Sequence, residues 1–171
     1  MRTFIVAATS SDGFIANKSH VNSFDWTSKA DKDSFKNLTK DAGVVIVGSK
    51  TFETFARTGE APRPLKGRLN IIYSRSKKYK GENVETTDKN PKELVKDLTI
   101  RGFQKAAIIG GAEIYRMFIE ADEVDTIYLT VEPIKFKTGI PFFNGNLKEK
   151  FQLKNTYKID KTEFRTYERK S

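Results

Sequence analysis

Asp31 combines a position at a helix start with an apolar face, which gives this carboxylate the clearest chemical potential in the sequence. Ser28 precedes it by three residues, so residues 28–31 read as an N-cap followed by an acid at the third helical position. Phe35 and Leu38 follow at i+4 and i+7 and place Asp31 on an apolar stripe. A carboxyl group in an apolar cleft has a raised pKa and can donate a proton near neutral pH. Helix capping and acid catalysis are both open for Asp31, and periodicity alone favours capping.

Three junctions between an apolar run and a helical pattern could bind an anion. Gly110 and Gly111 would let a phosphate approach the free N–H groups of a helix start, although a tight turn alone explains them equally well. Residues 47–51 (VGSKT) offer Lys50 and two hydroxyls, and residues 73–78 (YSRSKK) form a basic cluster, which is more commonly a solvated turn. Open α/β sheets bind nucleotides at the carboxyl ends of their strands. Three such junctions together predict a phosphorylated nucleotide cofactor.

The elements that must position these residues are strands buried on both faces and helices between them. Short continuous apolar runs predict parallel strands covered by helices over residues 3–9, 43–47, 69–74 and 105–109. Helical patterns cover residues 28–40, 49–55, 91–101, where Asn90 and Glu93 form a capping box, and 112–121. Residues 10–27 have no strong periodicity and predict a mobile loop over a site.

The C-terminal third changes character. Residues 124–131, 151–158 and 162–169 alternate apolar and polar side chains, as antiparallel strands do. No repeat or linker divides the chain, and 171 residues fit one domain. We therefore expect an α/β fold over residues 1–171: a mostly parallel central sheet flanked by helices and ending in an antiparallel hairpin.

Composition excludes several classes of site. The chain has no cysteine and one histidine, so it has no disulfide framework, thiol nucleophile or cysteine zinc site, and we expect no bound metal. With 31 basic and 22 acidic residues the net charge is +9, which favours anionic partners, although solubility is the commoner meaning. No apolar run is long enough for a signal peptide or a membrane span. We expect a soluble, cytoplasmic, monomeric protein with no membrane or nucleic-acid partner.

Six segments, in order and with compatible spacing, resemble the dihydrofolate reductase family. They are residues 5–8, Trp26 with 30–36, 44–54, 63–72, 108–115 and 128–130. The resemblance runs from about residue 4 to residue 143, and the C-terminal hairpin also fits. It implies NADPH-dependent reduction of 7,8-dihydrofolate to tetrahydrofolate, with hydride transfer to C6 and protonation of N5 promoted by Asp31 through water. It also implies a cis peptide between Gly110 and Gly111.

The resemblance further implies a set of site residues. Asp31 would hold the pterin amino group and ring nitrogen, Phe35 would pack on the aminobenzoyl ring, and Arg68 would pair with the carboxylate of the glutamate tail. The implied catalytic residues are Asp31, Trp26, Tyr115 and Thr130. The implied substrate-binding residues are Ile5, Ala7, Asp31, Phe35, Leu65, Arg68, Ile109 and Thr130. The implied cofactor-binding residues are Ala8, Ile15, Gly48, Ser49, Lys50, Thr51, Ser74, Arg75, Gly110, Gly111, Ala112, Glu113 and Ile114, with Arg75 on the 2′-phosphate.

Two alternatives stay open. Residues 11–16 and 139–143 resemble the related riboflavin-biosynthesis reductase domain, which shares the fold and NADPH but reduces a ribosylated pyrimidine. Ser28 and Lys29 stand where dihydrofolate reductases usually have Leu-Pro, and Ser49 replaces a frequent arginine that contacts the 2′-phosphate. A basic nucleic-acid-binding module is the third possibility, but the chain contains no motif of interleaved basic and aromatic residues.

Overall fold

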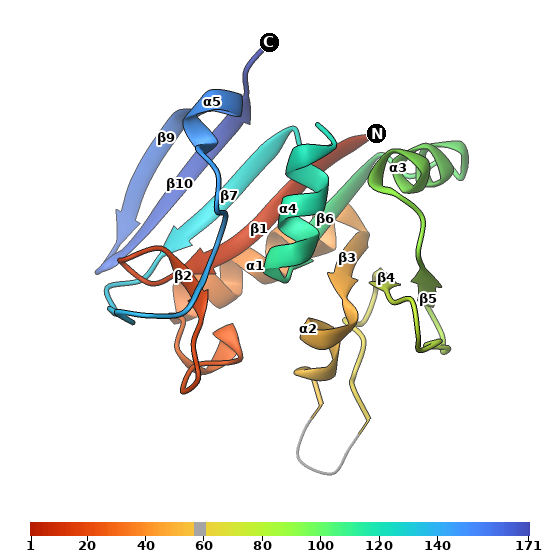
Figure 1. Ribbon diagram of the computed structural model, residues 1–171, viewed down its shortest axis with the longest axis horizontal. Helices are drawn as coiled ribbons and strands as arrows, with labels where there is room; N and C mark the ends of the chain where they lie inside the picture. The colour runs from red at the N-terminus through yellow and green to blue at the C-terminus, as the bar shows by residue number, and fades with distance from the viewer. Residues whose placement is uncertain (57–60) are drawn as a thin grey trace.

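Eight strands form one sheet in the order β5-β4-β3-β6-β1-β7-β10-β9 (Figure 1). The structure is a computed structural model that describes residues 1–56 and 61–171. The strands are β1 (Arg2–Thr9), β3 (Val44–Gly48), β4 (Leu69–Tyr73), β5 (Val84–Thr87), β6 (Lys105–Gly110), β7 (Thr126–Val131), β9 (Phe151–Ile159) and β10 (Thr162–Arg169). From β5 to β7 along this order neighbouring strands are parallel, and β10 alone runs in the opposite direction, antiparallel to both β7 and β9. The expected mostly parallel sheet with an antiparallel C-terminal hairpin is therefore confirmed.

Helices cover both faces of the sheet. In Figure 1, α4 (Ala112–Glu120) lies in front of the sheet and α1 (Lys29–Ala42) behind it. The remaining short elements are β2 (Phe14–Ala16), η1 (Ser23–Asp25), α2 (Ser49–Glu53), α3 (Pro91–Ile100), β8 (Ile140–Pro141) and α5 (Leu147–Lys150). Among the described residues, no helix is both long and apolar enough to cross a membrane.

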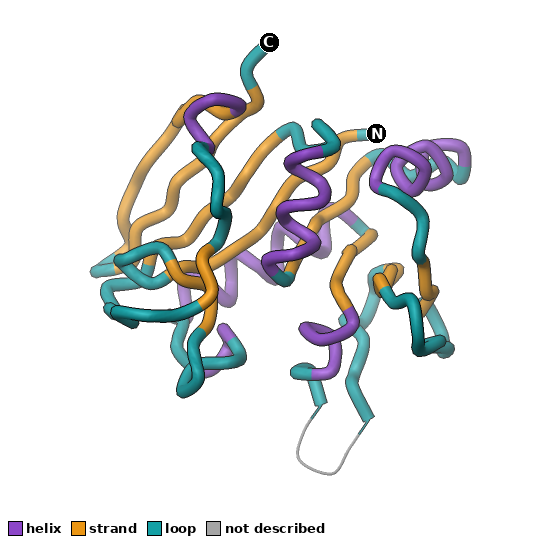
Figure 2. The backbone as a smooth tube through the Cα atoms, viewed as in Figure 1, coloured by secondary structure: helices purple, strands orange, loops and turns teal. Residues whose placement is uncertain are grey.

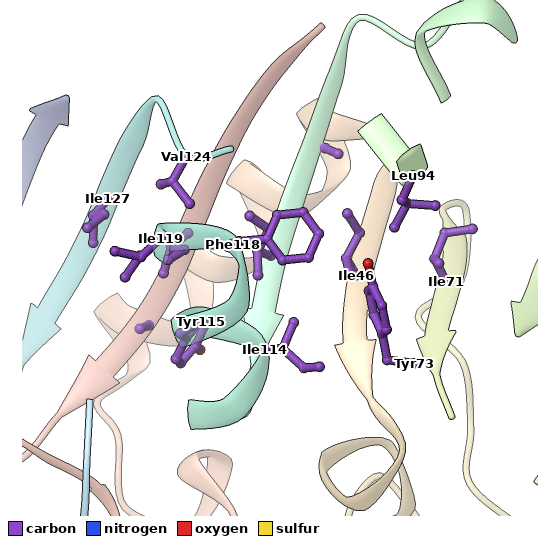
Figure 3. Close-up of a cluster of buried hydrophobic side chains, with 14 of the residues drawn as sticks. Ile46, Ile71, Tyr73, Leu94, Ile114, Tyr115, Phe118, Ile119, Val124 and Ile127 are labelled. Atoms are coloured by element: carbon purple, nitrogen blue, oxygen red, sulfur yellow. The ribbon is translucent and has the colours of Figure 1, made fainter. Parts of the chain in front are cut away.

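Alternation along β1 divides the core into two layers. Ile5 and Ala7 belong to the cluster under α3 and α4, whereas Phe4 and Val6 belong to the cluster under α1 and α2. Figure 3 shows the first layer, in which Phe118 of α4 points onto the sheet. Phe118 is fully buried, so its replacement by alanine would cost roughly 3–5 kcal/mol of folding free energy. Both faces of the sheet are thus covered by packed helices, so a binding site is more readily formed at the ends of the strands.

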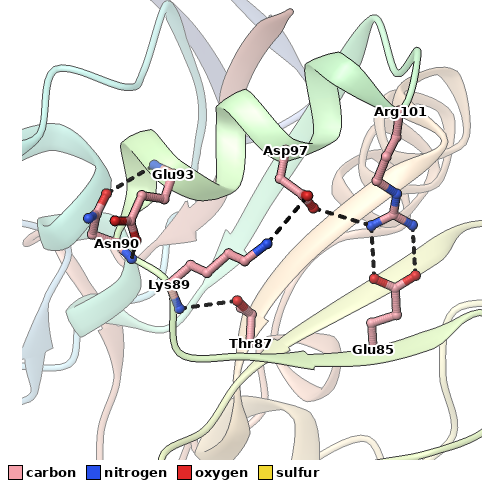
Figure 4. Close-up of polar contacts among 7 residues, drawn as sticks. All are labelled: Glu85, Thr87, Lys89, Asn90, Glu93, Asp97 and Arg101. Carbon is pink, nitrogen blue, oxygen red and sulfur yellow. Dashed lines mark hydrogen bonds and ion pairs between the residues drawn. The ribbon is translucent and has the colours of Figure 1, made fainter.

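Helix α3 begins and docks as its sequence predicts (Figure 4). The Asn90 side chain accepts the N–H of Glu93, and the Glu93 carboxylate accepts the N–H of Asn90, which completes a capping box. At the other end, Arg101 donates two hydrogen bonds to Glu85 of β5, at 2.9 and 2.7 Å. This bidentate contact joins α3 to the edge of the sheet.

Two expectations about the elements need correction, and one strand was not predicted. The segment ending at Val131 was expected to pair as an antiparallel strand, but β7 runs parallel to β1 and pairs antiparallel only with β10. Residues 10–27 are not all loop, because β2 pairs with β8 and η1 follows (Figure 2). Strand β5 was not predicted from the sequence, because four residues at a sheet edge are too few to show a periodic pattern.

Candidate active site

A cavity of about 960 Å³ opens where the parallel strands end. The carboxyl ends of β1, β3, β4 and β6 all lie at this edge, because parallel strands terminate on the same side of a sheet. Its size is that of a site for a small organic molecule. Of the residues singled out from sequence, those that line it are Ala7, Ala8, Ile15, Asp31, Phe35, Gly48, Ser49, Lys50, Thr51, Ser74, Arg75, Ile109, Gly110, Gly111, Ala112, Glu113, Ile114 and Tyr115.

Asp31 lies in the first turn of α1 and lines this cavity while only 8% exposed. The Ser28 hydroxyl accepts its backbone N–H at 3.1 Å, so the N-cap expected from sequence is present. Burial raises the pKa of the Asp31 carboxyl, and the hydroxyls of Thr130 and Thr27 offset this only in part. Its carboxyl group therefore keeps a proton to higher pH than an ordinary aspartate does.

Tyr115 of α4 is buried near Asp31. Its hydroxyl donates to the carbonyl of Val6 at 3.1 Å, and its ring packs against Phe142 with centroids 5.2 Å apart. Burial, together with the negative charge of Asp31, raises the pKa of Tyr115, so the phenol stays protonated. Gly110 allows this packing, because a Cβ there would lie 3.1 Å from the Tyr115 hydroxyl and its φ is +120°.

One half of the cavity offers groups that can bind a phosphate. Gly111 is the N-cap of α4 and has no side chain to cap it, so the first-turn N–H groups stay available to an anion. Lys50, Arg75 and Lys89 line the same half and supply positive charge. In addition, a Cβ at Gly111 would lie 2.8 Å from the Thr51 hydroxyl oxygen, which would then have to move. The Gly110–Gly111 peptide is cis, as the family resemblance implied.

The other half of the cavity is lined by aromatic rings. Phe24 meets Phe35 edge-on with centroids 5.5 Å apart and meets Phe55 at 6.3 Å. Asn22 donates from its side chain to the Thr54 carbonyl at 3.0 Å and so joins the segment before α1 to the end of α2. This end can pack a flat or ring-bearing ligand. Of these residues, the sequence singled out only Phe35. The contacts themselves were not predicted, because they join segments that share no periodic pattern.

The segment between β1 and α1 is tied to the loop before β8 through Asp12. Its carboxylate accepts the N–H groups of Phe136 at 3.0 Å and Lys137 at 2.7 Å, and the Ser10 hydroxyl at 2.7 Å. Burial alone would raise the pKa of Asp12, but these three donors outweigh it and lower the pKa to about 2. Ile15 and Val21 of the same segment line the cavity, so Asp12 anchors one wall of the site.

Five residues singled out from sequence lie outside the cavity lining. Ile5 is fully buried in the core beneath it, and Leu65 packs against the cluster under α1. Trp26 packs edge-on against Phe136, with centroids 5.0 Å apart. Thr130 reaches the site only through its contact with Asp31.

Arg68 is the fifth of these residues, and three of its five N–H donors are bound within the protein. Its guanidinium donates to the Thr39 hydroxyl at 3.1 Å and to the carbonyls of Lys66 at 2.7 Å and Lys36 at 3.1 Å. The residue is 8% exposed. Arg68 thus holds the C-terminal half of α1 against the segment before β4.

Two acidic residues near the site were not predicted from the sequence to have a role there. Asp12 and Glu132 each bind backbone N–H groups of a segment more than a hundred residues away. No local pattern announces such a contact. Among residues 1–56 and 61–171, no group of three or more His, Cys, Asp or Glu side chains is placed to hold a metal ion.

Comparisons with known proteins agree with this architecture. The profile of the family described as Dihydrofolate reductase matches residues 2–170. The dihydrofolate reductase of Lactococcus lactis is 32% identical over 143 residues, which cover 83% of this chain and 80% of that protein.

Two solved structures share the fold. A putative riboflavin biosynthesis protein from Shewanella sp. PV-4 superposes with a TM-score of 0.82 at 22% identity and full coverage of both chains. A dihydrofolate reductase from Enterococcus faecalis, complexed with NADP(H) and RAB-propyl, superposes with a TM-score of 0.76 at 22% identity, covering 99% of this chain and 97% of that one.

Proposed function

Because the chain belongs to the dihydrofolate reductase family, and so to a family of oxidoreductases, we propose that it reduces 7,8-dihydrofolate to tetrahydrofolate with NADPH. The observation that carries this proposal is the buried Asp31 carboxyl with its raised pKa, placed in the wall of a large cavity. The apolar surroundings keep the group protonated to higher pH, which suits a residue that directs a proton to a ring nitrogen.

In this proposal Asp31 has two tasks. Its carboxyl group pairs with the amino group and ring nitrogen of the pterin, which orients the ring, and it promotes delivery of a proton to N5. Phe35 and Phe24 pack against the aromatic middle of the substrate, and Ile109 forms the apolar floor. Tyr115, fixed on the Val6 carbonyl, closes the wall next to Asp31 and excludes water there.

NADPH, when bound, supplies the hydride that C6 of the substrate accepts. The chain offers the first-turn N–H groups of α4 for the pyrophosphate, since Gly111 leaves them uncapped. Lys50 and Ser74 line the same wall. Arg75 lies at its rim, mostly exposed and 3.7 Å from Glu113, and would pair with the 2′-phosphate. The remaining cofactor contacts implied by the family, from Ala8, Ile15, Ser49, Thr51, Ala112 and Ile114, line the cavity too.

The test is NADPH oxidation in the presence of dihydrofolate, with Asp31→Asn beside the native chain. The variant should lose roughly 10²–10⁴-fold in kcat near neutral pH, because it can neither hold nor pass the proton. Asp33→Asn is the matched control, since this carboxylate lies on the same helix turn but pairs with Lys29 in solvent. Equal loss in both variants, or NADPH binding without any turnover of dihydrofolate, would contradict the proposal.

The state of Arg68 supports a second candidate, reduction of a ribosylated pyrimidine. Three donors of Arg68 are bound to protein groups, and the side chain does not line the cavity, so the expected partner of a glutamate tail is already engaged. A substrate without that tail needs no such partner. Turnover of a ribosylaminopyrimidine phosphate that survives Asp31→Asn, with dihydrofolate inert, would move the assignment to this candidate.

A further inference from the structure

Glu132 is a buried carboxylate that the proposed reaction does not use. It directly follows β7 and is 3% exposed. One carboxylate oxygen accepts the backbone N–H of Ser28 at 2.7 Å, and the other accepts the Thr162 hydroxyl of β10 at 2.8 Å. Glu132 therefore connects the C-terminal hairpin to the residue that caps α1.

The start of α1 shows why this contact matters. In a capping box, the side chain of the third helical residue reaches back to the N–H of the N-cap residue. Helix α3 has this arrangement in full, with Glu93 bound to the N–H of Asn90 (Figure 4). Helix α1 has only half of it: Ser28 accepts the N–H of Asp31, but the N–H of Ser28 goes to Glu132. The acid in the third position of α1 is thereby released from capping.

We propose that Glu132 is a positioning residue, which takes over the acceptor half of the α1 capping box so that the Asp31 carboxyl stays free in the cavity wall. The alternatives that the sequence left open for Asp31, capping and chemistry, are then reconciled by a residue 101 positions away. The expected effect of Glu132 on turnover rests on the proposed reductase function. Its expected effects on the Ser28 amide and on the pKa of Asp31 can be measured in the ligand-free protein and do not depend on that function.

The charge of Glu132 acts in the same direction as its hydrogen bond. Burial is the main cause that raises the pKa of Asp31, and the negative charge of Glu132 adds to it. Lys32 on the same helix and the hydroxyls of Thr130 and Thr27 oppose the rise. The remaining titratable neighbour is Tyr115, which stays a neutral phenol.

The first test is an NMR titration of the Asp31 side-chain carboxyl in the ligand-free protein. Glu132→Gln keeps an oxygen for the Ser28 N–H but removes the charge, so the pKa of Asp31 should fall below its native value. Glu163→Gln is the matched control, because it makes the same change on β10 at a carboxylate paired with Arg165. An Asp31 titration identical in the native chain and in Glu132→Gln would overturn the charge argument.

The second test uses Glu132→Ala, which removes the acceptor as well. The Ser28 amide hydrogen should exchange about five- to tenfold faster than in the native chain, unless the Asp31 carboxylate captures it. In the latter case the pKa of Asp31 should fall further than in Glu132→Gln, because an N–H donor stabilises the charged form. Native exchange at Ser28 together with a native Asp31 titration would overturn the proposal.

Turnover supplies the third measurement. Glu132→Ala should lower kcat more than it raises KM, and Glu132→Gln should restore most of kcat while shifting the pH profile towards acid. If the native chain turns over no dihydrofolate, the proposed function fails, but both NMR readouts still decide the role of Glu132. Should the Glu132 variants not fold, Thr162→Val removes one anchor and should speed exchange at Ser28; unchanged exchange there would count against the proposal.

Discussion

At the scale of single residues, the burial that suits Asp31 for proton transfer also lowers the stability of the folded protein when the carboxyl is ionised. Asp31 is buried, and its folded-state pKa is raised above the ordinary value of 3.8. A raised pKa means that the folded state binds the proton more tightly than the unfolded state does. The resulting stabilisation is complete below pH 3.8 and is lost as pH rises through the folded-state pKa. Once the pH exceeds the folded-state pKa, the ionised and buried Asp31 therefore costs the protein folding free energy.

Asp31→Asn should consequently be more stable than the native chain near neutral pH, although it is less active. The amide carries no charge, so it escapes the penalty of burying a carboxylate. Urea unfolding of both proteins across a pH series checks this, and the difference should shrink as pH falls towards 3.8. A variant that is less stable than the native chain at neutral pH would contradict it.

Gly111 gives a second prediction at this scale. In Gly111→Ala the new Cβ would lie 2.8 Å from the Thr51 hydroxyl oxygen, so the Thr51 side chain must move within the cavity wall. We expect NADPH to bind roughly tenfold more weakly, in line with about 1–3 kcal/mol for an overpacked site. Calorimetry measures this, with Gly81→Ala as control, because a Cβ at Gly81 meets nothing closer than 3.6 Å. Equal affinities for both variants would refute the steric reading.

At the scale of elements, local signals were readable and distant ones were not. The capping residues of α1 and α3 predicted both helix starts, because the hydrogen bonds of a cap join residues three apart. Buried strands such as β3 were predicted from their continuous apolar runs. Glu132 was missed, because its partners Ser28 and Thr162 come from other parts of the chain. Most of the fold was therefore predictable, whereas the groups that hold the site in place were not.

The tie made by Asp12 gives a prediction about the segment before α1. Asp12→Ala removes the acceptor of two backbone N–H groups in the facing loop, so residues 10–27 should be cleaved faster by a protease and KM should rise several-fold. Asp25→Asn is the control, since Asp25 is an exposed acid of the same segment. Unchanged proteolysis in Asp12→Ala would exclude this anchoring role.

The native chain should show the same loosening in acid. Because the pKa of Asp12 is lowered to about 2, its contribution to stability is complete above 3.8 and is lost as pH falls towards about 2. Asp12→Ala should lack this acid-dependent step. A native chain whose proteolysis rate does not change over that interval would disagree with the proposed anchoring.

At the scale of the whole molecule, a net charge of +9 surrounds a cavity whose cofactor half carries Lys50, Arg75 and Lys89. A positive field of this kind attracts polyanions and is screened by salt. Nucleic acid would feel the same field, so a gel shift at low salt tests the expectation that it is not a partner. Net charge alone was compatible with an anionic ligand but is more commonly a matter of solubility, and only the fold shows which lysines and arginines line the cavity.

The dissociation constant for NADPH should accordingly rise with ionic strength. Arg75→Ala should make that dependence shallower, because one screened attraction at the cavity rim is gone. Lys154→Ala on β9, at the far edge of the sheet, removes the same charge and should leave the slope close to native. If the dissociation constant depended on ionic strength equally in all three proteins, the salt dependence would not arise from Arg75 at the cavity rim.

The position of β1 in the sheet also bears on how the chain is made. Strand β1 is hydrogen-bonded between β6 and β7, which follow it in the sequence, so during synthesis it has neither neighbour until residues 105–131 have been made. A nascent chain must keep its apolar β1 unpaired during that interval, which exposes it to misassembly. Thr162, the outer anchor of Glu132, emerges later still. The geometry of Asp31 is therefore completed only after Thr162 has been synthesised, although Asp31 itself is translated long before it.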